Sequence, residues 1–171
     1  MNSPFFNQKQ LELFMDSLQE YVKVDDQQMF YAMICAFLAH GNKKDKEGAP
    51  YYRHPLNVAR NLKEKNEKIV AMLHDVLEDS SITEENLQAM GFSDEVITAV
   101  KAMTRGKLQS YRSYLEQVCM NPLAKIVKLA DIQDNINPDR LEKLDAVTRT
   151  RLKNKYEKAI DFLNSYPDER A

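Results

Sequence analysis

Apolar residues recur at intervals of three and four positions along most of the chain, a spacing that gathers them on one face of a helix. In the first half this pattern predicts helices over residues 11–22, 29–40 and 69–79, and one that opens at 54. In the second half it predicts helices that start after 83 and 93, and others over 111–118, 123–136 and 144–163. No alternation of apolar and polar residues indicates a β-strand. The sequence therefore predicts an all-α fold, a bundle of about eight or more helices.

Several of these boundaries carry residues that start and stop helices. Thr83 and Ser93 are each followed by two acidic residues, as expected of N-cap residues ahead of a charged first turn. Gly91 stands before Ser93 as a stop signal, and Pro122 marks another helix start. No linker or internal repeat interrupts the chain. Residues 1–171 are therefore expected to form one domain, with residues 142–171 packing on its core as a C-terminal helix.

Length and composition fit an ordinary globular domain. The chain has 171 residues, of which 43% are hydrophobic and 29% charged, with a net charge of −2. So small a charge gives no field that would recruit nucleic acid or an acidic membrane, and any anion site must be built locally. The longest apolar run, residues 30–39, is about half of what spans a bilayer.

The cysteines and the amino terminus predict a cytoplasmic protein. Cys35 and Cys119 fall in apolar helical stretches and indicate no disulfide framework, and the N-terminal residues lack the pattern of a signal peptide. We expect neither nucleic acid nor a membrane as partner. A homodimer stays open, because the stripe of Tyr156, Ile160 and Leu163 on the last helix suits either the core or an oligomer interface.

One long loop, GNKKDKEGAPYYR, separates the helices that end at His40 and begin at His54. Long loops in compact domains often carry function. This loop and its end hold the densest local group of cations, Lys43, Lys44, Lys46 and Arg53. Such a group predicts a contact with phosphate.

The strongest chemical signal is the stretch AMLHDVLEDSS, which contains His74, Asp75, Glu78 and Asp79. On a helix, residues three and four apart share a face, so these charges cluster beside an apolar stripe. Crowded charges next to apolar surface are unfavourable unless a cation compensates them. A metal ion is the natural candidate.

Two residues elsewhere complete a ligand set. Asp131 is a lone carboxylate in an apolar helical stretch, and His54 opens its helix. Two nitrogens and two oxygens suit a six-coordinate Mn²⁺ or Fe²⁺ with positions left for water or substrate, and they come from His54, His74, Asp75 and Asp131. A metal lowers the pKa of bound water, which can then attack phosphorus, and Glu78 and Asp79 are placed to orient or deprotonate it.

Three motifs in order, HPxxVA at 54–59, HDxxED at 74–79 and KLADxxxN at 128–135, resemble the HD hydrolase domain of RelA/SpoT-type alarmone enzymes. With the lysine loop, the chain looks most like the small stand-alone hydrolases of the metazoan SpoT homologue type. The resemblance covers roughly residues 28–141, and we expect no nucleotide-synthesising domain after it. It implies an all-helical fold, Mn²⁺ at the four ligands, and Glu78 and Asp79 at the attacking water.

The resemblance also implies a reaction, the removal of pyrophosphate from the 3′ position of (p)ppGpp to leave GDP or GTP. The implied nucleotide-contacting residues are Lys43, Lys44 and Asn135. Two positions depart from the family. Lys43 stands where arginine is frequent, and lysine cannot form a bidentate fork with phosphate. Asp134 stands where histidine or tyrosine is usual, and its charge either disfavours a nucleotide or points outward.

Several alternatives stay open at this point. An HD phosphohydrolase such as a 5′-nucleotidase would release inorganic phosphate from a monophosphate instead, and a nucleotide-binding sensor would bind without turnover. The preferred purine is also open. Lys128 pairs with Asp131 or Asp134, or else contacts substrate. Tyr51 and Tyr52 either stack on a base or pack on the core, while His40, at a helix C-terminus, is interpreted as structural.

Overall fold

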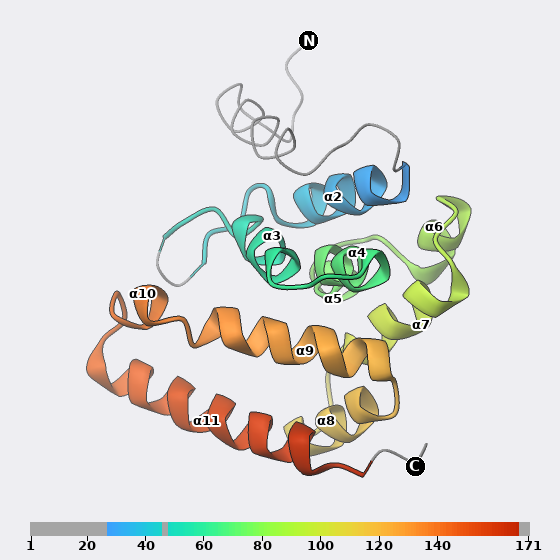
Figure 1. The fold of residues 1–171 in the computed structure, drawn as a ribbon. Helices are drawn as coiled ribbons and strands as arrows, with labels where there is room; N and C mark the ends of the chain where they lie inside the picture. Colours follow the sequence, from blue (N-terminus) through green and yellow to red (C-terminus); the bar gives the residue numbers. More distant parts are fainter. Residues whose placement is uncertain (1–26, 46–47, 168–171) are drawn as a thin grey trace.

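The computed structural model describes residues 27–45 and 48–167, which are mostly helical (Figure 1). The helix expected over 11–22 and Lys46 lie outside the described residues. In chain order the helices are α2 (Gln27–His40), α3 (Arg53–Arg60), α4 (Lys65–Leu73), α5 (Val76–Asp79), α6 (Glu84–Ala89), α7 (Asp94–Met103), α8 (Tyr111–Cys119), α9 (Pro122–Asn135), α10 (Pro138–Leu141) and α11 (Ala146–Ser165). These residues include no β-strand, only an isolated bridge between Lys44 and Pro50. The all-α prediction is confirmed.

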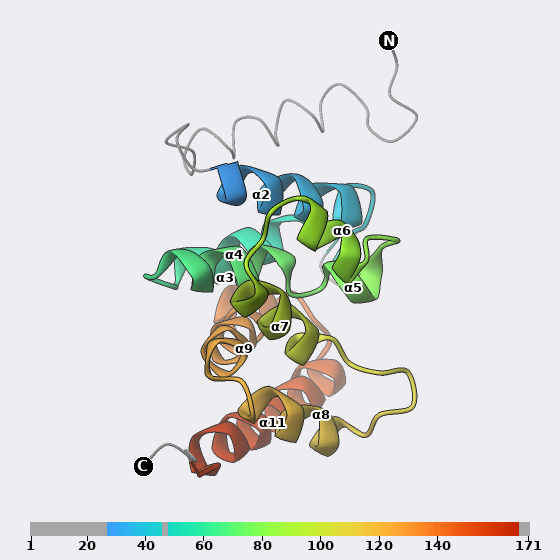
Figure 2. The ribbon, with the colours of Figure 1, turned by 90° about the vertical axis from the view of Figure 1, so that its right-hand side faces the viewer.

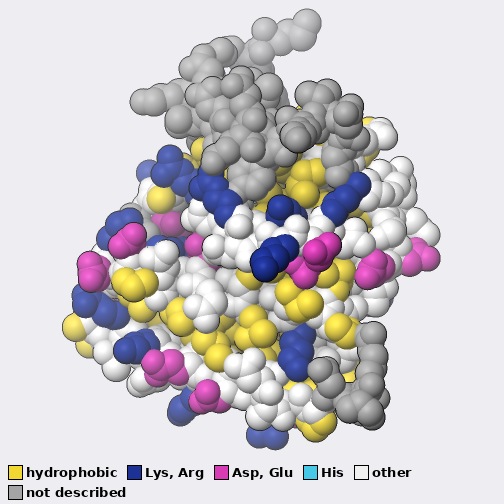
Figure 3. All heavy atoms as spheres, in the orientation of Figure 1, with side chains coloured by type: hydrophobic (Ala, Val, Ile, Leu, Met, Phe, Trp, Pro, Cys, Tyr) yellow, Lys and Arg dark blue, Asp and Glu magenta, His cyan; other side chains and the backbone are white. Residues whose placement is uncertain are grey.

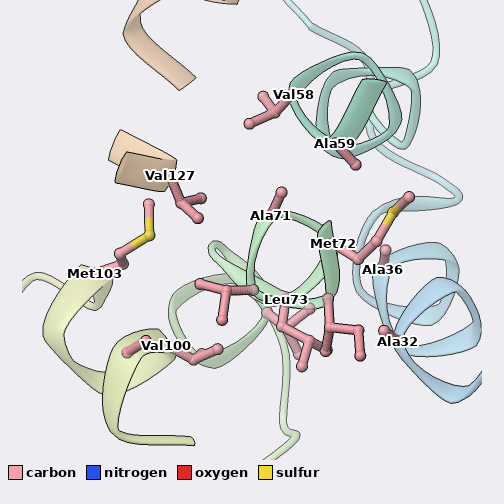
Figure 4. Packing of buried hydrophobic residues seen from close by; sticks show 14 of the residues in the cluster. Ala32, Ala36, Val58, Ala59, Ala71, Met72, Leu73, Val100, Met103 and Val127 are labelled. Atoms are coloured by element: carbon pink, nitrogen blue, oxygen red, sulfur yellow. The ribbon is translucent and has the colours of Figure 1, made fainter. Parts of the chain in front are cut away.

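The helices stack in layers around α4. Both ribbon views show α2, then α3 and α4, then α9, and finally α11 from one end of the described molecule to the other (Figures 1 and 2). Helix α4 contacts α2, α3, α7 and α9, and Ala71, Met72 and Leu73 are fully buried among their side chains (Figure 4). The second half of α4, residues 69–73, is buried on all sides and forms the centre of the core. The residues that directly follow α4 therefore start from a tightly packed element.

The last helix, α11, packs on α8 and α9. Leu163 is part of the buried core, and Tyr156 and Ile160 pack against it. These three residues were expected to belong to either the core or an oligomer interface, and the structure supports the core. The assignment of residues 1–171 to one domain stays a prediction.

Side-chain caps define the predicted starts of α6 and α7. The Thr83 side chain accepts a hydrogen bond from the backbone nitrogen of Asn86, and Ser93 accepts one from that of Val96. Gly91, between the two helices, has a φ of 82°, a left-handed conformation that glycine adopts without strain. The capping predictions for these two helices are confirmed.

The prediction of one continuous helix over residues 69–79 is wrong. It is two helices, because α4 ends at Leu73 and α5 begins at Val76. Asp75 lies between them with φ −103° and ψ −2°, away from the regular helical values of about −63° and −42°. Consecutive side chains on a regular helix diverge by about 100°. The break instead brings Asp75 Oδ2 to 3.1 Å from His74 Nε2.

On the face seen in Figure 1, basic side chains lie among acidic and hydrophobic ones and form no single charged area (Figure 3). No histidine is visible on that face, and His40, His54 and His74 are all buried. None of the helices in the described ranges is long and apolar enough to cross a membrane.

Candidate metal centre

Three helical elements bring the predicted metal ligands together. His54 lies in the first turn of α3, His74 and Asp75 join α4 to α5, and Asp131 lies in the second half of α9. Helices α3, α4 and α9 all contact one another. His54, His74 and Asp131 are consequently buried at the point where the three helices meet.

The distances among these side chains are those of a candidate metal site. His54 Nε2 lies 3.0 Å from Asp131 Oδ1, and His74 Nε2 lies 3.9 Å from the same oxygen. One ligand atom from each of His54, His74 and Asp131 falls within 4.8 Å of the others. A group of two imidazoles and a carboxylate is a usual donor set for a divalent transition metal.

The hydrogen bonds of the two imidazoles fit a metal between them. His74 Nδ1 donates to the Ala71 carbonyl oxygen at 2.7 Å, which leaves Nε2 buried and without a hydrogen-bond partner among the described residues. His54 Nδ1 lies 2.7 Å from Asp134 Oδ2, so its Nε2 also faces inward. Metal-binding histidines typically bond an acceptor through the other ring nitrogen in this way.

The electrostatics of the centre also favour a cation. Burial alone would lower the pKa of His54, but Asp131 and Asp134 raise that pKa to about 9. Burial likewise opposes a proton on His74, yet Asp75 and Asp131 raise its pKa above the ordinary value. Carboxylates that hold protons on buried imidazoles would equally stabilise a metal ion in their place.

Asp75 lies beside this group, outside the set of three. Its Oδ2 accepts a hydrogen bond from the Tyr51 hydroxyl at 2.6 Å. Burial would raise the pKa of Asp75, but the His74 imidazole outweighs burial and holds that pKa below the usual range. Asp75 is therefore ionised and oriented toward His74. The other loop tyrosine, Tyr52, is buried and packs edge-on against Phe37. Of the two alternatives for Tyr52, the structure therefore shows packing on the core.

Asp131 is held by two neighbours on its own helix. Lys128 Nζ donates to Asp131 Oδ2 at 2.8 Å, and Asn135 Nδ2 donates to Oδ1 at 2.6 Å. Despite burial, the Lys128 charge keeps the pKa of Asp131 well below its usual range. The structure thus shows the pairing of Lys128 with Asp131, one of the alternatives for this residue. Asn135, implied as a nucleotide contact, meets Asp131 directly.

Glu78 and Asp79 lie on α5, and both side chains are only partly exposed. Glu78 Oε1 accepts a hydrogen bond from the Arg105 backbone nitrogen. Partial burial raises the pKa of Glu78, although the bond from Arg105 opposes the shift. Asp79 Oδ2 lies 3.2 Å from Lys43 Nζ, which also donates to the Asp79 carbonyl oxygen at 2.7 Å.

A cavity of about 400 Å³ opens beside the metal group. Its lining residues are Lys44, Asp45, Tyr51, His54, Asp75, Lys128, Asp131, Asn135, Arg140, Leu144, Leu152 and Tyr156. Lys44 and Asn135, two of the predicted substrate residues, are in this lining, whereas Lys43, Glu78 and Asp79 are not. The cavity thus combines polar and charged groups with an apolar wall from Leu144, Leu152 and Tyr156.

Asp134 departs from both alternatives considered for it. It neither faces a nucleotide nor points outward, because it is only 4% exposed and its Oδ2 contacts both His54 Nδ1 and the Arg140 guanidinium. The positive charge of Arg140 offsets the negative charge of Asp134, which was considered unfavourable for a nucleotide from the sequence alone.

Arg140 is a site residue that the hydrophobic pattern missed. It belongs to α10, a four-residue helix with too few positions to show a period. The signal present in the sequence is the run Asn137-Pro138-Asp139, since Asn137 caps the Asp139 backbone nitrogen at 2.9 Å and proline suits a first turn. Such a start predicts a helical turn after α9.

Comparison with known proteins finds no matching family model. The chain is 37% identical over 109 residues to the guanosine-3′,5′-bis(diphosphate) 3′-pyrophosphohydrolase of Aquifex aeolicus, over 57% of this chain and 16% of that protein. It is 36% identical over 110 residues to the Mus musculus enzyme of that name designated MESH1, over 56% of this chain and 61% of the relative. The chain thus spans less than two thirds of these relatives.

A structural relative agrees with the fold. The solved structure of a metazoan ortholog of SpoT that hydrolyzes ppGpp matches with a TM-score of 0.69, covering 84% of this chain and 89% of that one. The two sequences are 22% identical, so this likeness concerns the fold. The resemblance to RelA/SpoT-type HD hydrolases, stated from three short motifs, is confirmed.

Proposed function

We propose that this protein hydrolyses the 3′-pyrophosphate of ppGpp or pppGpp, releasing pyrophosphate and leaving GDP or GTP. The printed names of the relatives support this substrate class. One structural observation carries the proposal: the buried group of His54, His74 and Asp131 borders a cavity that also holds basic side chains. A cytoplasmic location, where cysteines stay reduced, is part of the proposal.

His54, His74 and Asp131, with Asp75 beside them, would hold a divalent ion. We propose Mn²⁺, with Fe²⁺ or another divalent metal as the alternative, because the donors are two nitrogens and carboxylate oxygens. Such an ion supplies a water of lowered pKa and neutralises charge on a phosphoryl group.

The charge of the cavity also calls for a cation. With His54 set aside as a neutral metal ligand, the charged side chains of the lining are Lys44, Lys128 and Arg140 against Asp45, Asp75 and Asp131, and their formal charges cancel. A polyphosphate requires a positive site, and a divalent ion would create one. Among the described residues the Lys44 ammonium forms no ion pair, whereas Lys128 is bound to Asp131. We therefore assign Lys44 to the phosphates, with Asn135 and Lys43 as further substrate residues.

In the proposed reaction the oxygen of a water bonds to the phosphorus attached to O3′, and the P–O3′ bond breaks. The electron pair stays on O3′, which takes a proton. Glu78 and Asp79 are assigned to the attacking water, with Glu78 as the base. Partial burial supports that choice, because a carboxylate with a raised pKa accepts a proton more readily.

The test is to incubate the purified protein with ppGpp and Mn²⁺ and to measure GDP and pyrophosphate. Activity that disappears with a chelator and returns with Mn²⁺ supports the proposal. Inorganic phosphate released from deoxynucleoside monophosphates would indicate the 5′-nucleotidase alternative. No turnover by protein that demonstrably holds Mn²⁺ would refute the proposal, and nucleotide binding under those conditions would indicate a sensor.

A further inference from the structure

The two histidines of the metal group are oriented by different means. His74 Nδ1 donates to the backbone carbonyl of Ala71, in the last turn of α4, so the acceptor that sets its tautomer belongs to the backbone of the helix that His74 follows. His54 instead meets a side chain from α9, because its Nδ1 lies 2.7 Å from Asp134 Oδ2. The orientation of His54 therefore depends on a contact between residues 80 positions apart.

Asp134 can serve only as an acceptor while it is ionised, which makes His54 Nδ1 the donor. The Arg140 guanidinium contacts the same Oδ2 and lies 3.2 Å from His54 Nδ1. Two donors thus share one carboxylate oxygen. A buried carboxylate is unfavourable without a cation, and Arg140 supplies that cation at the point where His54 binds.

Arg140 also connects the centre to the loop that precedes α3. Its second terminal nitrogen lies 3.8 Å from Asp45 Oδ2, next to Lys44 in the cavity lining. Asp45 in turn accepts a hydrogen bond from the Ala49 backbone nitrogen at 2.9 Å, which shapes the loop. Arg140 thus joins the loop, α9 and α10 around His54.

We infer that Asp134 and Arg140 form a positioning pair that aims His54 Nε2 at the metal site. The inference rests on the proposed function, since it concerns the metal that this function requires. Asp134 presents the acceptor, and Arg140 keeps that acceptor charged and in place. Neither residue is assigned to the reacting atoms.

The experiment measures Mn²⁺ affinity directly, by the EPR signal of free Mn²⁺ during titration of the protein. Removing an outer partner of a metal-binding histidine typically weakens metal affinity by about 10- to 100-fold. Asp134→Ala is expected to reach this range. Asp134→Asn should lose less, because its amide oxygen still accepts from Nδ1, and Arg140→Gln should weaken binding in the same direction.

The matched control is Asp139→Asn, which removes the same charge from an exposed residue of α10 and should leave Mn²⁺ affinity unchanged. Thermal unfolding in chelator separates positioning from general damage. A positioning role predicts that Mn²⁺ affinity falls markedly while the unfolding temperature in chelator changes little. It also predicts that saturating Mn²⁺ restores most of kcat.

The outcomes separate the two claims. If the native protein binds no Mn²⁺, the proposed metal centre fails and the inference with it. If the native protein binds Mn²⁺ and hydrolyses ppGpp while Asp134→Ala binds equally well, only the positioning role is wrong. Should Asp134→Ala not fold, the Asp134→Asn and Arg140→Gln affinities decide, and native values in both would overturn the inference.

Discussion

His40 offers a test of how burial controls charge near the candidate site. The ring is fully buried, and neither nitrogen has a hydrogen-bond partner among the described residues. Asp79 Oδ2 lies 3.5 Å from His40 Nδ1 and favours a proton there. Burial outweighs the attraction of Asp75 and Asp79 and lowers the pKa of His40 to about 4, so the ring is neutral at pH 7. The structural role of His40 stays a prediction.

The sign of the pH dependence follows from this pKa. In the unfolded chain the ring takes a proton near pH 6.5, whereas in the folded protein it stays neutral down to about pH 4. The unfolded state therefore binds more protons in this window, and the free energy of unfolding falls as the pH falls. A shift from 6.5 to about 4 corresponds to roughly 3 kcal/mol in total. The loss should be complete below about pH 4.

The assay is urea unfolding of the native protein and of His40→Phe, in chelator, at intervals from pH 7.5 to 4. Phenylalanine cannot take a proton, so its free energy of unfolding should decline less steeply, with a difference of up to roughly 3 kcal/mol near pH 4. Met33→Leu is the control, because it is a fully buried, uncharged change on the same helix and should follow the native profile. Parallel profiles for His40→Phe and the native protein would refute the reasoning.

Three further predictions concern catalysis, substrate and core. Glu78→Gln should lower kcat by about 100-fold or more while Mn²⁺ affinity stays native; an unchanged kcat in steady-state assays would remove Glu78 from the mechanism. Lys44→Ala should raise KM for ppGpp more than Lys43→Ala does, because Lys44 lines the cavity whereas Lys43 is paired with Asp79; an equal or larger rise in KM for Lys43→Ala would contradict this order. Leu73→Ala should reduce the free energy of unfolding by about 2–5 kcal/mol, measured by urea, while Val147→Ala at a 79% exposed position should stay within about 0.5 kcal/mol.

Much of the helical fold could be predicted because its signals are local. The boundaries of α7 and α8 follow from residues within a few positions, such as the Ser93 and Ser110 caps. The break between α4 and α5 could not be found in this way, since the apolar period continues through Val76. It accompanies contacts that the apolar pattern does not contain, between Asp75 and both His74 and the Tyr51 hydroxyl.

The same division applies to the candidate site. Residue types and motif spacing were enough to nominate His54, His74 and Asp131, because metal chemistry restricts the donors. The direction of Asp134, the binding of Lys43 to Asp79, and the entry of Arg140 into the centre were not determined by any local pattern. Each depends on a contact between residues that no helical spacing relates. The side-chain conformation is then set by the contacting residue.

The sequence by itself determined the helical class, the order of the helices and the chemical character of the site. Periodicity, caps and donor atoms act over a turn or two of helix and can be read in one dimension. Only the tertiary structure decided which side chains share a charge. His54 on α3 and Arg140 on α10 both contact Asp134 on α9, so Asp134 is the acceptor of His54 and not a negative charge that faces a nucleotide. Burial and distance set the free energy of such ionic contacts, and both arise only when the helices meet.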